Sequence, residues 1–220
     1  MERLLETIKS AQEQLKHSLD HILDCQGAFT TEQYSRYLSM QYHLTNGVEQ
    51  HFYAIAGHKE LESYPKLRKF LVKFAEEERP HYKIAFNDLK NMQCEPHEVM
   101  LEVKLWWAYF NEVIKTRPFV RLGATCILEN ISSRSDEVIS KLLGSSKFIT
   151  PKNTRFLEIH RHNELPHGDE ILDYLTDAKL KEHHINDLLE GAKDGSKLFL
   201  GLLEWGLFPE TEWKLIRSPR

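Results

Sequence analysis

The chain has 220 residues, with 29 Lys and Arg against 33 Asp and Glu, and its size fits one domain with a proper hydrophobic core. A formal net charge of −4 gives no reason to expect nucleic acid or an anionic membrane as a partner. The charged N-terminal segment does not resemble a signal peptide, and no apolar run approaches the roughly 20 residues that span a bilayer. Three widely spaced cysteines without a CxxC pair favour a cytoplasmic location over a disulfide framework.

Apolar residues recur at steps of three and four along most of the chain, and no run shows the alternation that is typical of a strand. The pattern predicts an all-α fold: a single bundle of about seven helices, covering residues 1–220 as one domain. The first four expected helices cover about 2–25, 31–57, 63–91 and 95–118. The fifth ends near residue 131 and is followed by a shorter piece at 135–143. The sixth opens at 150–151, and the last covers about 177–206, before a polar tail from about 207.

Two of these helices carry polar residues on the face that should be buried. One face reads Leu67, Leu71, Phe74, Glu78, His81 and Ala85; the other reads Leu157, His160, Glu164, His167, Ile171 and Tyr174. Residues at such steps share one side of a helix. An unpaired carboxylate there would cost several kcal/mol, so protonation, a cation or a metal must neutralise it.

The segments Glu78-Arg-Pro-His81 and Glu164-Leu-Pro-His167 share one local form. Each places a Glu and a His about 60° apart around the helix, so both side chains can face one centre. Each Pro directly before the His is expected to kink the helix. Glu-x-x-His from two helices, with a Glu from each of two others, builds di-iron or di-manganese sites in helical bundles. Glu129 and Glu49 offer further carboxylates, and His160 adds a nitrogen donor.

A buried network without metal is the competing interpretation, with Arg79, Arg155 or Arg161 as counter-ions. Two Glu-x-Pro-His segments together with a third carboxylate favour a metal centre instead. The predicted ligands are Glu78, His81, Glu129, His160, Glu164 and His167. Glu49, Cys126 and Tyr174 are expected to support these ligands, and Glu77 and Glu49 are rivals of Glu78. Carboxylates with several imidazoles suit Fe(II) or Mn(II) better than metals that prefer thiolates.

Four further histidines lack a converging set of carboxylates in the sequence. They are His51, His58, His183 and His184, and they are interpreted as surface or supporting residues. His17 and His21, near the start of the chain, invite comparison with a heme ligand, but acidic neighbours make a solvated face the better interpretation.

Through these motifs the chain resembles the heme-oxygenase-like diiron oxidase and oxygenase family. The family pattern His-x3-(Asp/Glu)-x2-His is matched by His160, Glu164 and His167, with a Glu where Asp is frequent. A lone Glu about thirty residues earlier matches Glu129. Glu78 and His81 correspond to the family's first metal helix, although many members place six residues between that Glu and His. In this chain that position holds Phe74.

The resemblance implies a non-heme diiron enzyme that activates O2 and oxidises a small organic substrate, with manganese as the alternative metal. It also leaves room for a homodimer, and neither nucleic acid nor a membrane is expected as a partner. Two alternatives come from the same fold superfamily: a metal-free hydrolase of the thiaminase-II kind with Cys126 as nucleophile, and a heme-binding protein. A non-catalytic helical protein is the third alternative.

Overall fold

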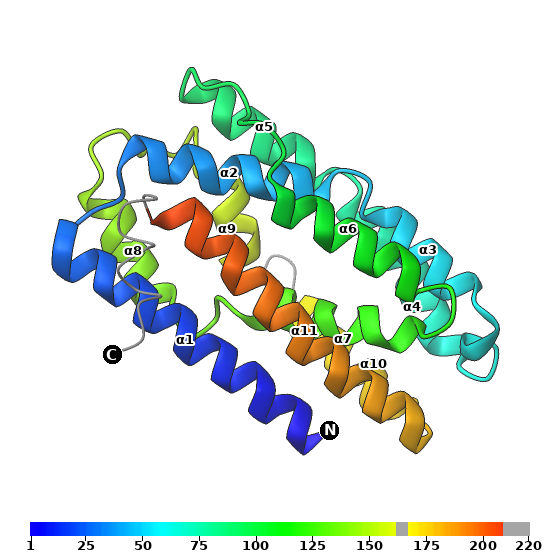
Figure 1. Ribbon diagram of the computed structural model, residues 1–220. Coiled ribbons are helices and arrows are strands. Elements are labelled where there is room, and N and C mark those ends of the chain that lie inside the picture. The colour runs from blue at the N-terminus through cyan, green and yellow to red at the C-terminus, as the bar shows by residue number, and fades with distance from the viewer. Residues whose placement is uncertain (162–166, 209–220) are drawn as a thin grey trace.

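The computed structural model describes residues 1–161 and 167–208, and this part of the chain is a bundle of α-helices with no β-strand (Figure 1). Its elements are α1 (Glu2–Gln26), α2 (Thr31–Thr45), α3 (Glu49–Gly57), the short 3-10 helix η1 (Lys59–Leu61), α4 (Pro65–Glu78), α5 (His81–Asn91), α6 (Leu101–Val113), α7 (Pro118–Asn130), α8 (Asp136–Ser145), α9 (Arg155–Arg161), α10 (His167–Asp177) and α11 (Glu182–Leu207). The all-α class expected from the sequence is confirmed. Among the helices described, none is both long enough and apolar enough to cross a bilayer.

The centre of the bundle is the packing of α7 against α11, and α1 runs beside α11 (Figure 1). Small residues let the two central helices approach closely. A Cβ added at Gly191 of α11 would lie 1.7 Å from the carbonyl oxygen of Val120 in α7, a distance that no side chain tolerates. This contact fixes α7 in the core, and α7 carries Glu129 near its C-terminal end.

The described residues form more helices than the seven expected, in part because two long expected helices are interrupted. Residues 46–48 separate α2 from α3, and Gly47 there has a φ of +91°, which favours glycine. Arg79 and Pro80 separate α4 from α5. Pro80 stands where a kink was expected, since proline has no N–H to donate and crowds the preceding turn. Glu78 therefore ends one helix and His81 begins the next.

The helix expected to open at residue 95 begins instead at Leu101. The segment before it is held by contacts with α2. The backbone N–H of His97 donates to Oγ of Ser39 at 3.1 Å, and Nε2 of His43 donates to the carbonyl of His97 at 2.8 Å. These bonds satisfy backbone groups that a longer helix would have used.

The helix expected from residues 150–151 begins instead at Arg155. The backbone N–H of Thr150 donates to Oδ1 of Asn153 at 2.8 Å, so the preceding residues form a turn of their own. Asp88 of α5 then accepts the backbone N–H of Phe156 at 2.8 Å, which supplies the N-terminal cap of α9 from another helix. The final helix ends at Leu207 as expected, and the predicted polar tail continues into residues 209–220, outside the described part of the chain.

Candidate metal centre

Five of the six predicted ligands meet where the ends of several helices converge. Glu78 is the last residue of α4, His81 the first of α5, and His167 the first of α10. Glu129 lies one residue before the end of α7, and His160 lies in α9. The sixth, Glu164, falls in residues 162–166, which are outside the described residues.

The carboxylate of Glu78 lies between two groups of donors. Its Oε2 is 2.8 Å from Nδ1 of His81, and its Oε1 is 3.0 Å from Nδ1 of His167. On the Oε2 side, Glu78, His81 and His160 offer ligand atoms within 4.8 Å of one another; on the other side, Glu78, Glu129 and His167 do the same. One buried carboxylate is thus shared by two groups that could each hold a metal ion.

Several of these donor atoms are buried and make no well-formed hydrogen bond within the described residues. They are Oε1 of Glu78, Nδ1 of His81, Nε2 of His167 and Oε2 of Glu77. Nε2 of His167 lies 3.3 Å from Oε2 of Glu77, yet neither atom has a hydrogen-bond partner in this part of the chain. Buried polar atoms are normally satisfied. Donors that converge without pairing fit a metal ion between them, so the residues present fit such a group.

The side chains of the centre balance only part of its negative charge: burial lowers the pKa of His167, but the neighbouring carboxylates of Glu78 and Glu129 outweigh burial and raise that pKa. Burial raises the pKa of Glu78, but its contacts with His167 and His81 outweigh burial and hold that pKa well below its usual range. Burial, and then the Glu78 carboxylate, raise the pKa of Glu129 to about 8. Glu78 and Glu129 offer ligand atoms within 4.8 Å of one another, and two carboxylates so close together cannot both ionise readily without a cation.

His160 is prepared as a ligand by its own helix. Its Nδ1 is 2.6 Å from the carbonyl oxygen of Phe156, one turn earlier, and a carbonyl can only accept. The Nδ1–H therefore donates, which leaves the lone pair of Nε2 free. Ligating histidines are usually oriented in this way. Burial lowers the pKa of His160 to about 4, so the ring is neutral at physiological pH.

Close packing brings α10 to α7. A Cβ added at Gly168 would lie 2.6 Å from Oδ1 of Asn130 and 2.8 Å from the carbonyl oxygen of Glu129. Only a residue without a side chain fits there. Gly168 thereby allows the neighbouring His167 to come within 3.8 Å of the Glu129 carboxylate.

The rivals of Glu78 differ in position. Glu77 is partly buried, and its Oε2 lies 3.3 Å from Nε2 of His167, while its Oε1 pairs with Lys73 at 3.3 Å. It therefore borders the centre without joining the group of His81 and His160. Glu49 begins α3 and belongs to none of the metal-capable groups in the described residues.

Two supporting residues were also expected. Cys126 is fully buried in α7, three residues before Glu129, and burial raises the pKa of its thiol to about 12. The expectation for Tyr174 is wrong: this residue is 37% exposed and stacks on Phe70 at 4.3 Å. Tyr174 shares a helix face with His167, but seven residues carry it about 10.5 Å along the axis of α10.

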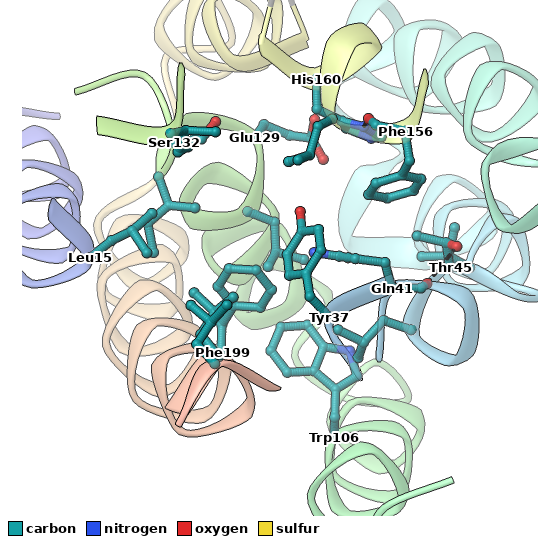
Figure 2. A pocket seen from close by; sticks show the side chains of 18 of the residues that line it. Leu15, Tyr37, Gln41, Thr45, Trp106, Glu129, Ser132, Phe156, His160 and Phe199 are labelled. Carbon is teal, nitrogen blue, oxygen red and sulfur yellow. Dashed lines mark hydrogen bonds between the residues drawn. The ribbon is translucent and has the colours of Figure 1, made fainter. Parts of the chain in front are cut away.

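A cavity of about 130 Å³ adjoins the centre. Figure 2 shows Glu129 and His160 directed into it, opposite Tyr37 and Trp106. Most of its wall is apolar. Cavities of about 150 Å³ hold a molecule of the size of benzene, so the space next to the candidate ligands suits a small, largely apolar molecule.

Arg121 also lines this cavity, and the sequence analysis missed it. It is 1% exposed, its Nη1 donates to Oγ1 of Thr125 at 2.6 Å, and no carboxylate among the described residues lies within ion-pair distance. Positions 121, 125 and 129 share one face of α7, so helical periodicity counted back from Glu129 was the signal that could have found it.

No protein-family model matches the sequence, and no curated protein matches it. Among solved structures, the chain is similar to a domain of unknown function with a heme oxygenase-like fold from Shewanella denitrificans OS217. The TM-score is 0.75 at 19% sequence identity, with 96% of this chain and 94% of that chain covered. The chain therefore has a heme oxygenase-like fold, as expected from its motifs. A fold of this kind does not determine the reaction, which has to be argued from the site.

Proposed function

We propose that this protein is a non-heme diiron enzyme that uses O2 to oxidise a small, partly apolar organic molecule. The observation that supports this most directly is the Glu78 carboxylate, whose two oxygens face separate groups of donors. Carboxylates placed in this way hold two metal ions side by side in enzymes that use metal pairs. The set of carboxylates and imidazoles suits iron, with manganese as the alternative.

In this proposal Glu78, His81 and His160 would hold one ion, and Glu78, Glu129 and His167 would hold the other. Glu164, which the motif places with His160 and His167, is assigned to the same centre from the sequence. Two ferrous ions held there would supply electrons for the reduction of O2. The ions would offset the negative charge of Glu78 and Glu129, which the neighbouring histidines balance only in part.

The remaining residues of the cavity bind and orient the substrate. Apolar side chains exclude water from the reacting atoms. Arg121 and Gln41 are polar groups in its wall, and either can hold a polar end of the substrate. The volume limits the part that enters to about the size of a benzene ring.

The two enzymatic or ligand-binding alternatives have less support. A thiol buried as completely as Cys126, with its pKa raised to about 12, is a poor nucleophile at neutral pH. A heme is several times larger than benzene, whereas the cavity measures about 130 Å³. His17 and His21, the residues compared with a heme ligand, are exposed on α1.

The test is to reconstitute the protein with ferrous iron under anaerobic conditions, remove unbound metal, and measure iron content and O2 uptake. We expect close to two irons per chain and rapid O2 consumption. His167→Ala should lose most of the iron, whereas His17→Ala, which changes an exposed histidine on α1, should keep it. Normal iron content in His167→Ala would refute the ligand set. An active Cys126→Ser enzyme would exclude the hydrolase.

A further inference from the structure

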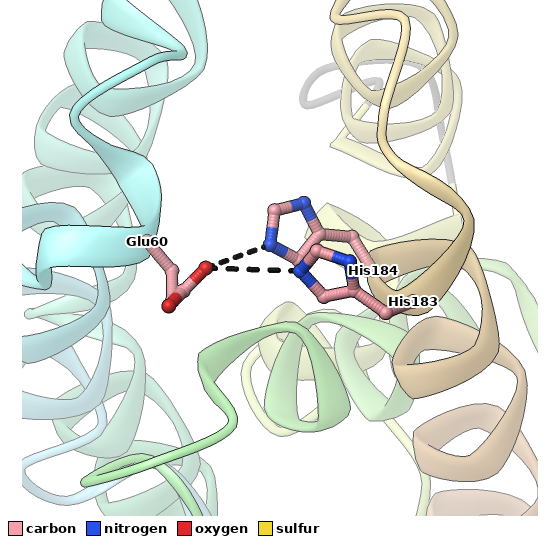
Figure 3. A group of neighbouring side chains, drawn as sticks. All are labelled: Glu60, His183 and His184. Carbon is pink, nitrogen blue, oxygen red and sulfur yellow. Dashed lines mark hydrogen bonds and ion pairs between the residues drawn. The ribbon is translucent and has the colours of Figure 1, made fainter.

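A second group of metal-capable side chains lies away from the Glu78 centre. Glu60 of η1 faces His183 and His184 at the start of α11, across 124 residues of sequence (Figure 3). Its Oε2 is 3.0 Å from Nε2 of His184 and 3.8 Å from Nε2 of His183. The ligand atoms of all three lie within 4.8 Å of one another. The interpretation of His183 and His184 as residues without a carboxylate partner is therefore wrong.

The imidazole of His184 is held rigidly. The residue is 1% exposed, and its ring stacks on Phe119 with a centroid distance of 4.1 Å. Its Nδ1 lies 3.0 Å from the hydroxyl of Tyr64, which also accepts the backbone N–H of Lys181 at 3.4 Å. A Tyr64 oxygen that accepts the Nδ1–H leaves the lone pair of Nε2 directed at Glu60, the arrangement in which ligating histidines are usually found.

Glu60 is also fixed, by its backbone. The backbone N–H of Glu60 donates to Nδ1 of His58 at 3.1 Å, so His58 caps η1. Nε2 of the same ring donates to the carbonyl of Lys115 at 3.1 Å, which ties η1 to the end of α6. The carboxylate therefore comes from a short, anchored element, and its position opposite α11 does not depend on a long flexible loop.

The spacing of the three donors fits zinc. Zinc–nitrogen and zinc–oxygen distances of about 2.0–2.2 Å with tetrahedral angles place ligand atoms about 3.3–3.6 Å apart. The distances of 3.0 and 3.8 Å from Glu60 lie on either side of this range. The side chain of His183 is 61% exposed, so water can occupy the fourth position. One carboxylate and two imidazoles are ligands that zinc accepts.

We propose that Glu60, His183 and His184 bind one divalent metal ion, best Zn(II), at a site separate from the Glu78 centre. The ion would join η1 to the N-terminal end of α11 and so hold together two segments distant in the sequence. The site shares no residue with the candidate diiron centre. It therefore does not depend on the proposed enzymatic activity.

Without a metal, the same contacts would be a hydrogen bond and an ion pair. In that case Nε2–H of His184 donates to Glu60, and the Tyr64 hydroxyl donates to Nδ1. Removing the exposed His183 would then change little, because His184 keeps both of its partners. The two interpretations differ in what His183 contributes.

The experiment is a Zn(II) titration of the iron-loaded protein in competition with a chromophoric chelator, with iron measured before and after. We expect the wild type to bind one zinc ion per chain at this site. The variant His183→Gln should bind that zinc ion at least tenfold more weakly. His17→Gln is the matched control, because His17 is exposed on α1 and belongs to none of the metal-capable groups of the described residues, and it should bind zinc as the wild type does. Tyr64→Phe keeps the ring but loses the hydroxyl, and it should weaken this site about 10- to 100-fold.

Thermal unfolding gives a second readout. Zinc should raise the melting temperature of the wild type and of His17→Gln, but not that of His183→Gln. Equal zinc binding by the wild type and His183→Gln would overturn the proposal, and so would a wild type that binds no such zinc. Iron content in His183→Gln should remain that of the wild type, so a failure here is distinct from a failure of the diiron assignment.

Discussion

Replacing Glu78 by Gln tests the shared carboxylate directly. Gln has nearly the same shape, but it carries no charge and only one oxygen. In the wild type Oε2 faces His81 at 2.8 Å and Oε1 faces His167 at 3.0 Å, so in the variant one of the two groups must face an NH2. Mutating even a partner of a ligand weakens metal binding about 10- to 100-fold. Loss of a shared charged ligand should reach at least the upper end of that range, about 2.7 kcal/mol per ion.

The assay is iron content after anaerobic reconstitution and desalting, together with O2 uptake. Glu78→Gln should retain less than one iron per chain and consume little O2. Glu76→Gln is the matched control on the same helix, because Glu76 is 53% exposed and pairs with Arg79. Glu77→Gln should lose iron only in part, since Glu77 contacts His167 alone among the described candidate ligands. Two irons in Glu78→Gln, or a greater loss in Glu77→Gln, would refute the assignment.

Three further predictions concern the elements that position the centre. Gly168→Ala should lower iron content severalfold, because the new Cβ would lie 2.8 Å from the Glu129 carbonyl and displace α10; unchanged iron would contradict this. Gly191→Ala should lower the free energy of unfolding by about 1–3 kcal/mol in a urea titration, because the new Cβ would collide with the backbone of Val120 in α7. A smaller loss would show that α7 and α11 separate easily to make room for it. Burial raises the pKa of Asp88 from 3.8 to about 6, so the stability that this carboxyl provides is full below its unfolded value and declines as pH rises to about 6. Asp88→Asn, which does not titrate, should therefore gain up to about 2.4 kcal/mol relative to the wild type between pH 4 and pH 7, and a difference independent of pH would contradict the shift.

The convergence of the candidate ligands followed from helical periodicity. Glu78 and His81 continue a face that begins with buried Leu67 and Leu71, and such a face has to point into the core. The structure places both residues there, although they belong to two helices separated by Arg79 and Pro80. The interruption leaves both side chains on the same side.

Where a feature depended on contacts between distant segments, the sequence was a poor guide. The start of α9 is set by Asp88 of another helix, and the start of α6 by bonds to Ser39 and His43. Tyr174 shows a related limit. Periodicity says which side of a helix a residue occupies, but it does not say how far along the axis the neighbouring site lies.

The helical class, the amphipathic faces and the two Glu-x-Pro-His segments can be read from the order of residues, because they arise from local geometry repeated every 3.6 residues. Which carboxylate is shared, how close α10 comes to α7, and that Glu60 meets His183 and His184 depend on packing. Such contacts join positions as much as 124 residues apart. They form only when the core brings those segments together, since no local rule of the chain encodes a distance between them.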